Sequence, residues 1–207
     1  MGDHWLGIYV WALTGFLVGA VPFAVILGRA ASGKDIRRVG DGNPGAANAW
    51  KAAGSCIGIA AVAIEILKGA IPTLLAVKIG GLGGWELCVV GFAPILGHAF
   101  SPFLGFRGGK AIAVTSGVWA ALTPWGLGFP IACLCQALFH LLQSTHAWTV
   151  VLGFTLFGII VMLWLRLDYL AILWAMNLVL IVAKHKDELK KPLSPRSWLL
   201  RLPGFQN

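Results

Sequence analysis

The chain has 207 residues, of which 58% are hydrophobic and only 12% are charged, and its mean hydropathy is +0.81. Soluble globular proteins use roughly 45–50% apolar and about 25% charged residues, so this composition excludes a soluble domain. The formal charge of +8 suits nucleic acid, an anionic lipid surface or an anionic substrate, and the positions of the charges along the chain must decide between them.

Long apolar runs predict about seven transmembrane helices. A bilayer core needs about 20 apolar residues per helical crossing, so seven crossings nearly fill the chain. The runs cover residues 5–28, 52–77, 85–104, 112–123, 125–142, 148–165 and 169–183. We therefore expect an all-α integral membrane protein in which residues 1–207 form a single domain, with a basic tail over about 184–207.

Basic residues predict the orientation of these crossings. Five lie in the first loop, two in the third loop and six near the C-terminus: Arg29, Lys34, Arg37, Arg38, Lys51, Arg107, Lys110, Lys184, Lys186, Lys190, Lys191, Arg196 and Arg201. By the positive-inside rule, the C-terminus is cytoplasmic and the N-terminus lies outside, as an odd number of crossings requires. The lead 1–4 contains no Lys or Arg, so the first run is expected to stay in place and not to be cleaved as a signal peptide.

The first polar cluster is the loop 34–48, which is rich in Gly and Asn. Residues 40–45 formally satisfy the dinucleotide pattern G-x-G-x-x-G. No strand precedes them, however, and the motif binds a dinucleotide only after a strand, so a dinucleotide site is excluded. Glycine backbone can still aim successive N–H groups at an anion such as phosphate. The alternative is a flexible turn that carries positive-inside charges.

The second cluster, 105–110, contains Gly108, Gly109 and Lys110. It differs from a nucleotide-binding Walker loop because Leu104 stands where that loop needs Gly and Ala111 replaces the magnesium-binding Ser or Thr. Gly-Gly-Lys before an apolar helix still offers amides and an ammonium group to phosphate. His98, just upstream, is either a packing residue or a titratable group of the same site.

The third cluster places Glu65 and Lys68 on one face of a helix. Ionisable groups within a crossing usually face a polar interior or a cavity, although an ion pair that fixes helix packing is the alternative. His185, at the end of the last run, is a candidate for the same cytoplasmic site. The four Cys residues fall in apolar runs with no disulfide or metal-ligand spacing, so no metal site is predicted.

Together these clusters resemble the bacterial acylphosphate-dependent glycerol-3-phosphate acyltransferases of the PlsY type. The resemblance runs from the first helix to the last and is carried by residues 19–23, 29, 35–37, 40–48, 67–69, 97–98, 102–103, 106–110 and 184–187. It implies a multi-pass protein of the bacterial plasma (inner) membrane with its active site facing the cytoplasm. It also implies transfer of a fatty acyl group from acyl phosphate to glycerol 3-phosphate, giving lysophosphatidic acid for phospholipid synthesis.

The resemblance implies membrane lipids as surroundings and no cofactor, nucleic acid or obligate protein partner. The catalytic residues implied are Lys110, His98 and Asn43. The residues expected to bind substrate or phosphate are Arg37, Gly42, Gly45, Asn48, Lys51, Lys68, Gly108, Gly109 and His185. The tail 190–207 is expected to lie at the membrane surface outside the site.

This sequence departs from the family pattern at five positions. They are Asp41 for Ser, Ala47 for Thr, Lys51 for Arg, Ala111 for Gly and Glu188 for Asn. Asp41 matters most, because its carboxylate repels phosphate unless Arg37, Lys51 or Lys110 neutralises it. A role for Asp41 as general base toward the glycerol hydroxyl is the sharper alternative.

Two other functional classes stay open. A transporter of a phosphorylated small molecule would also use basic loops and buried charge, but it typically shows inverted repeats, and none is apparent. A catalytically silent relative that binds phosphate or lipid would account for the lost hydroxyls. The His-x4-Asp and Gly-x-Ser-x-Gly motifs of other acyltransferases and hydrolases are absent from the sequence.

Overall fold

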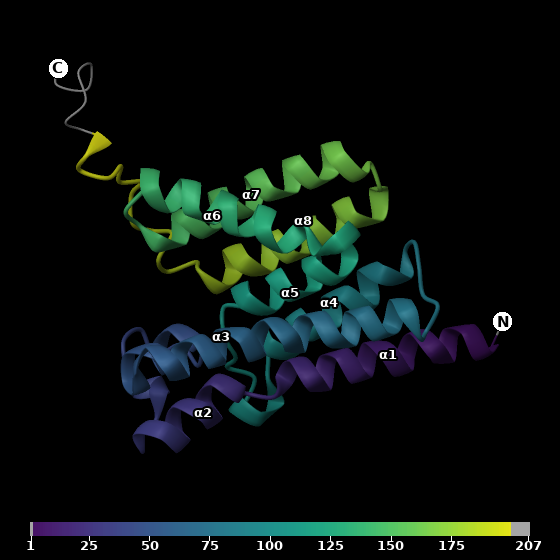
Figure 1. The fold of residues 1–207 in the computed structure, drawn as a ribbon, viewed down its shortest axis with the longest axis horizontal. Coiled ribbons are helices and arrows are strands. Elements are labelled where there is room, and N and C mark those ends of the chain that lie inside the picture. Colours follow the sequence, from purple (N-terminus) through teal and green to yellow (C-terminus); the bar gives the residue numbers. More distant parts are fainter. Residues whose placement is uncertain (1, 200–207) are drawn as a thin grey trace. The chain divides into compact units, whose positions relative to one another are not determined.

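The computed structural model describes residues 2–199, and its regular elements are helices (Figure 1). The α-helices are α1 (Gly2–Ala20), α2 (Phe23–Ser32), α3 (Ala46–Lys78), α4 (Glu86–Ala99), α5 (Ile112–Leu122), α6 (Gly128–Leu142), α7 (His146–Leu165) and α8 (Asp168–Lys184). Three short 3-10 helices are η1 (Ile36–Arg38), η2 (Pro102–Leu104) and η3 (Pro124–Gly126). The prediction of an all-α protein is confirmed.

Each predicted apolar run is largely helical in the structure. Within the described residues, five helical segments are long and apolar enough to cross a membrane: His4–Ser32, Ala46–Lys78, Glu86–Leu104, Pro124–Leu142 and His146–Leu165. The other two runs form α5, with 11 residues, and α8, with 17. These two helices correspond to the shortest of the predicted runs.

The first run is not one continuous helix, and in this respect the prediction was wrong. Helix α1 ends at Ala20 and α2 begins at Phe23, because Pro22 has no N–H to donate and its ring obstructs a continuing helix. The second run also differs, since α3 begins at Ala46 and bends at Gly54, whose φ of 85° favours glycine. Both irregularities lie close to the polar loop 33–45.

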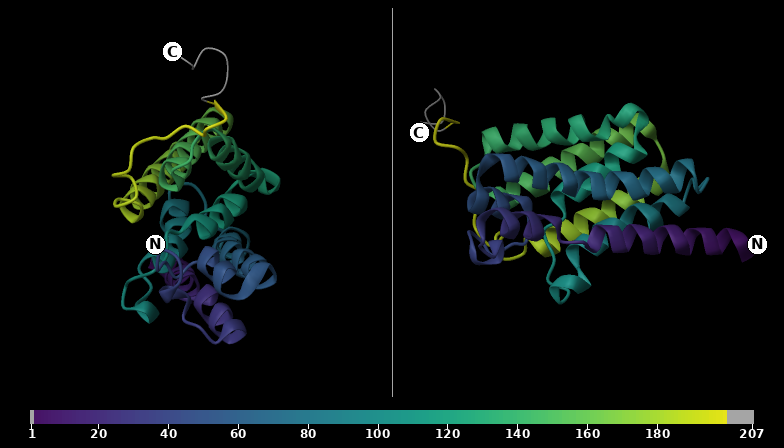
Figure 2. Two further views of the ribbon diagram at one scale, coloured as in Figure 1. Left: turned by 90° about the vertical axis from the view of Figure 1, so that its left-hand side faces the viewer. Right: turned by 60° about the horizontal axis from the view of Figure 1, so that its bottom comes forward.

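The chain divides into two compact units, Met1–Gly128 and Phe129–Asn207. In the first unit, α1 packs against α3 and α4, and α3 also packs against α2 and α5 (Figure 2). In the second unit, α7 packs against α8. A single domain over the whole chain stays a prediction.

Close helix packing in the first unit depends on glycines. A side chain at Gly97 in α4 would overlap the main-chain carbonyl of Phe16 in α1, and one at Gly117 in α5 would overlap that of Ile66 in α3. Small residues allow this approach in a bilayer, where dispersion contacts and hydrogen bonds hold helices together.

The described part of the basic tail lies against the turn between α6 and α7. Ser144 N donates to the Ser194 carbonyl at 2.8 Å, and Trp148 Nε1 donates to the Lys191 carbonyl at 2.9 Å. Trp198 Nε1 donates to the Leu141 carbonyl at 3.0 Å. The remainder of the predicted tail, 200–207, lies outside the described residues.

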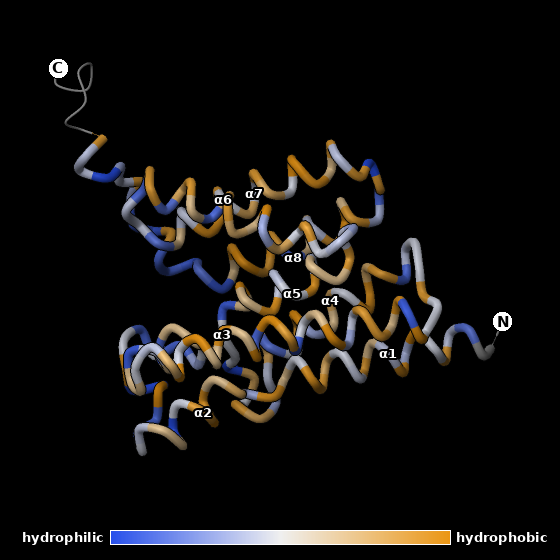
Figure 3. The backbone as a smooth tube through the Cα atoms, in the orientation of Figure 1, coloured by the Kyte–Doolittle hydropathy of each residue, from blue (hydrophilic) through white to orange (hydrophobic). Residues whose placement is uncertain are grey.

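The loop 33–45 is a strongly polar part of the first unit. Figure 3 shows hydrophilic segments in the loop 33–45 between α2 and α3, whereas the helices that flank the loop are mostly hydrophobic. This loop lies at the end of the unit away from the start of α1 (Figure 1).

Replacing Gly97 by Leu should destabilise the first unit. The new side chain would force α4 away from the Phe16 carbonyl, and overpacking of this kind costs about 1–3 kcal/mol. Gly7→Leu is the matched control, because nothing lies within 4 Å of a Cβ at Gly7. Thermal unfolding in lipid nanodiscs measures both; equal midpoints for the two variants would contradict the close approach.

Candidate active site

The break between α1 and α2 leaves main-chain polar groups without helical partners inside an apolar segment. An unsatisfied peptide group costs several kcal/mol in a bilayer, so side chains must supply the missing bonds. Ser101 Oγ donates to the Ala20 carbonyl at 2.6 Å, and Lys68 Nζ donates to the Val21 carbonyl at 3.0 Å. Buried polar residues from two other elements therefore converge on the break.

Glu65 joins three helices at this point. Its Oε1 accepts a hydrogen bond from the N–H of Ala24 in α2 at 3.3 Å. Its Oε2 lies 2.7 Å from Nζ of Lys68 in α3 and 2.9 Å from Nδ1 of His98 in α4. The Glu65 and Lys68 side chains are each only 2% exposed. The predicted pair is thus a buried network that includes His98, a contact that sequence reasoning missed.

This network fixes the orientation of His98. A carboxylate can only accept hydrogen bonds, so the Nδ1 of His98 carries the hydrogen in its contact with Glu65. The opposite ring atom, Nε2, faces Gly109, since a Cβ at Gly109 would overlap it. The imidazole thus lies between the buried carboxylate and the loop that carries Lys110.

Gly108 and Gly109 have a packing role in this arrangement. A side chain at Gly108 would overlap the His98 carbonyl, and Gly109 N donates to that same carbonyl at 3.1 Å. Glycine is needed here for close approach to the end of α4. The Gly109 amide is thereby hydrogen-bonded within the protein, and a phosphate contact for either glycine stays a prediction.

The loop that precedes α3 folds around the Asp41 carboxylate. Gly40 and Gly42 flank this residue with φ of 61° and 74°, the left-handed region that favours glycine. Asp41 Oδ1 accepts from Asn43 N at 3.2 Å and from Asn48 Nδ2 at 2.9 Å. Asn48 Nδ2 also donates to the Asn43 carbonyl at 2.9 Å. Two asparagines of the motif are therefore arranged around one carboxylate.

Lys110 joins the two predicted phosphate loops. Its Nζ lies 2.8 Å from Asp41 Oδ2, across 69 positions of sequence. Burial alone would raise the pKa of Asp41, but hydrogen bonds from Lys110, Asn43 and Asn48 outweigh it and lower this pKa to about 2. Asp41 is therefore ionised at neutral pH, and of the three predicted cations, Lys110 forms the ion pair with it.

The other two cations of the loop are placed differently. Arg37 forms a two-pronged contact with Asp35, with Nη2 at 2.7 Å from Oδ2 and Nε at 3.0 Å from Oδ1. Hydrogen bonding from Arg37 lowers the pKa of Asp35 to about 2. A Cβ built on Gly40 would lie 2.9 Å from Lys51 Nζ, so this ammonium group is beside the Asp41 turn.

Ala111 occupies a strained position where the family pattern has glycine. It caps α5 with φ of 63° and ψ of 12°, in the left-handed region. For a residue with a Cβ this conformation costs roughly 1–2 kcal/mol. This left-handed turn directly follows Lys110, whose Nζ contacts Asp41.

His185 lies in the second unit. Its buried ring places Nδ1 2.8 Å from the Ile181 carbonyl, and its centroid lies 6.3 Å from that of His146. Its participation in the site stays a prediction.

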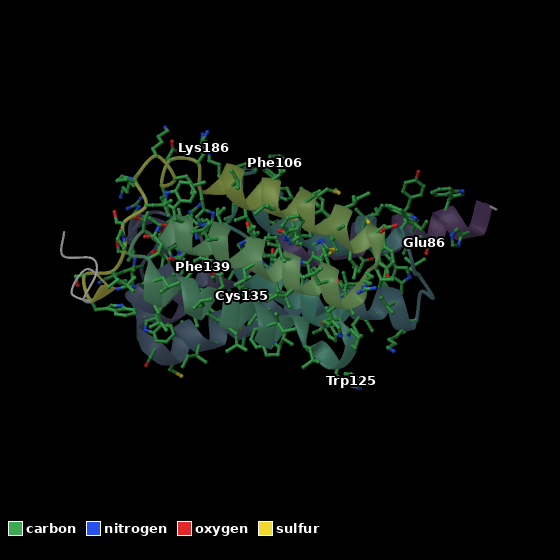
Figure 4. The ribbon with its side chains drawn as sticks, turned by 90° about the horizontal axis from the view of Figure 1, so that it is seen from above. Glu86, Phe106, Trp125, Cys135, Phe139 and Lys186 are labelled. Atoms are coloured by element: carbon green, nitrogen blue, oxygen red, sulfur yellow. The ribbon has the colours of Figure 1, made fainter. Side chains whose placement is uncertain are left out.

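The loops that meet at Lys110 and Asp41 lie near the C-terminal end of α4, together with His98. Glu86 is the first residue of α4 and Phe106 lies on the loop that follows this helix; Figure 4 labels both, with Glu86 nearer the start of α1. Glu86 forms an ion pair with His4 near the start of α1. Phe106 is on the loop that carries Lys110, so this loop, the loop at Asp41 and His98 lie away from the start of α1.

Comparison with known sequences gives one family. The family model described as glycerol-3-phosphate acyltransferase matches residues 9–194. A Thermotoga maritima protein named glycerol-3-phosphate acyltransferase 1 is 36% identical over 191 residues, covering 86% of this chain and 94% of that protein. A Deinococcus radiodurans protein of the same name is 36% identical over 184 residues, covering 86% and 88%.

Solved structures agree with the sequence matches. A crystal structure of PlsY, an integral membrane glycerol 3-phosphate acyltransferase, in its glycerol 3-phosphate form has a TM-score of 0.80 and 27% identity. The alignment covers 88% of this chain and 90% of the PlsY chain. The lysophosphatidic acid form gives a TM-score of 0.75 and 25% identity with the same coverage.

Replacing Glu65 by Gln should destabilise the first unit strongly. The variant keeps the shape of the side chain but leaves the Lys68 ammonium buried without its counter-charge, a loss of about 3–5 kcal/mol. Glu86→Gln is the control, since Glu86 pairs with an exposed His4. Thermal midpoints in nanodiscs measure both, and a Glu65 variant as stable as the Glu86 variant would contradict this role.

Proposed function

The chain belongs to the glycerol-3-phosphate acyltransferase family, and from this membership we propose that it transfers a fatty acyl group from acyl phosphate to glycerol 3-phosphate. It is a multi-pass bacterial membrane enzyme that acylates glycerol 3-phosphate for phospholipid synthesis. The observation that carries the proposal is the Lys110–Asp41 contact, because it brings the two predicted phosphate loops together beside His98.

Acyl phosphate as the donor agrees with the chemistry of these residues. It is a mixed anhydride, so attack of the glycerol hydroxyl oxygen on the acyl carbonyl carbon breaks the bond to phosphate, which leaves with the electron pair. Such a donor requires no thioester, metal or nucleotide. The protein has mainly to position two anions and to stabilise negative charge as the carbonyl is attacked.

We assign phosphate binding and charge stabilisation to the two loops. Lys110 provides the ammonium group, Asn43 and Asn48 provide hydrogen-bond donors, and the turn at Gly42 and Gly45 shapes the loop backbone. Arg37 and Lys51 add positive charge next to these loops. Arg37 is paired with Asp35, and Lys51 lies beside Gly40.

His98 is the proposed group for the proton of the attacking hydroxyl. Its Nδ1 contacts Glu65, and its Nε2 faces Gly109 beside Lys110, so Nε2 is the ring atom on the side of the proposed phosphate loops. Lys68 and Glu65 form the polar floor behind it. The prediction for His185 is that it orients the acceptor or handles its proton.

The site is proposed to face the cytoplasm of the bacterial inner membrane, with the N-terminus outside. Within the first unit, the loops that hold Arg37 and Lys110 lie at the end opposite His4, as the Glu86 contact with His4 indicates. The positive-inside rule assigns the end rich in Lys and Arg to the cytoplasm. The proposed reaction uses membrane lipids as surroundings and no obligate protein partner.

Product formation separates this function from the other two classes. Protein reconstituted in vesicles is incubated with radiolabelled glycerol 3-phosphate and palmitoyl phosphate, and labelled lysophosphatidic acid is measured. An enzyme forms this product, whereas a transporter or a silent phosphate-binding relative forms none.

Lys110→Ala should lower kcat/KM for acyl transfer by roughly 10²–10³-fold, the range seen when a donor that stabilises developing charge is removed. Lys78→Ala is the matched control, because Lys78 is exposed at the far end of α3. Turnover is measured in the vesicle assay, with circular dichroism to follow the fold. Retained turnover in Lys110→Ala would remove Lys110 from the mechanism.

A further inference from the structure

Asp41 is bound by the groups that the proposed function assigns to phosphate. One carboxylate oxygen accepts from Asn43 N and Asn48 Nδ2, and the other lies 2.8 Å from Lys110 Nζ. A carboxylate and a phosphate group accept the same kinds of hydrogen bond, from backbone N–H groups, amides and ammonium groups. The Asp41 side chain therefore satisfies donors that an anionic ligand would otherwise use.

The two partners of the ion pair differ in exposure. The Asp41 side chain is 45% exposed, whereas the Lys110 side chain is only 16% exposed. Asp41 can regain water if it leaves the pair, while Lys110 would be left partly buried and without this counter-charge. Exchange of Asp41 for an incoming anion is therefore easier than withdrawal of Lys110, because a buried charge is stable only when it is paired.

We propose that Asp41 is an internal competitor that takes the hydrogen bonds of the phosphate site in the absence of substrate and is displaced when a phosphate group binds. This inference rests on the proposed function, since it assigns a specificity role to the same site. The incoming group takes Lys110 and Asn48 as partners, and the Asp41 carboxylate turns to solvent.

The competition makes the site selective for charge. A phosphate monoester carries about −1.5 to −2 charges at neutral pH, whereas a carboxylate carries −1. Lys110 is attracted more strongly to a doubly charged phosphate than to the singly charged Asp41. A free carboxylate carries the same charge as Asp41, so it has no electrostatic advantage in displacing it. The residue thus disfavours singly charged anions and weakens the binding of every anion, phosphate included.

The test measures binding of inorganic phosphate by isothermal titration calorimetry, with the protein in nanodiscs of zwitterionic lipid. Asp41→Ser restores the hydroxyl of the family pattern, and Asp41→Asn retains the shape of the side chain. Asp168→Asn is the matched control, because it removes one exposed carboxylate at the start of α8. The KM for glycerol 3-phosphate is measured on the same four proteins.

Both Asp41 variants should bind phosphate roughly tenfold or more tightly than the parent, since phosphate no longer has to displace a carboxylate from Lys110 and Asn48. Acetate should compete with phosphate in these variants at lower concentrations than in the parent, and Asp168→Asn should behave as the parent does. Unchanged or weaker phosphate binding in both Asp41 variants would overturn the proposal. Loss of the fold in both would overturn it too, because a competitor for substrate can be removed without unfolding the protein.

Binding and turnover distinguish failure of this inference from failure of the proposed function. Tighter phosphate binding in the variants with no acyl transfer by any of the proteins would support the competitor and refute the enzyme. Acyl transfer by the parent with weaker phosphate binding in the variants would do the opposite.

Discussion

The site depends on the contacts that the buried Glu65 carboxylate makes with three neighbouring groups. This carboxylate binds the first free amide of α2, the ammonium group of Lys68 and the imidazole of His98, so it ties three helices together where Pro22 breaks the first membrane-spanning segment. Inside a bilayer, main-chain groups freed by such a break must be satisfied by the protein. The same buried charges that satisfy them also set the position of the histidine proposed to act in catalysis.

A second and more exposed ion pair, between Lys110 and Asp41, joins the loop before α5 to the loop before α3. Lys110 reaches Asp41 from a loop whose Gly108 and Gly109 pack directly on the end of α4. The two ion pairs differ in exposure, and this difference matters for function. The pair at Glu65 is buried and structural, whereas the Asp41 carboxylate is exposed enough to exchange with a ligand. The buried Glu65 network therefore supports a proposed anion site in which Lys110 can exchange one anionic partner for another.

Apolar runs and local motifs were sufficient to predict approximately where the helices lie, and they also singled out the two polar loops that meet at Lys110 and Asp41. Hydropathy identified the apolar helices because lipid demands long apolar stretches, and glycine-rich polar segments marked the two loops proposed to bind phosphate. The contact between Glu65 and His98 could not be predicted, since the residues are 33 positions apart and lie on different helices. The break at Pro22 was missed because hydropathy does not register a lost hydrogen bond. Which cation neutralises Asp41 also depended on tertiary packing.

The most direct measurement is an experimental structure of the chain in lipid with glycerol 3-phosphate bound. The phosphate group is expected within hydrogen-bond distance of Lys110 Nζ and Asn48 Nδ2, with the Asp41 carboxylate turned away and Glu65 still bound to His98. A ligand phosphate bound elsewhere, with the contact between Lys110 and Asp41 intact, would contradict the proposed site.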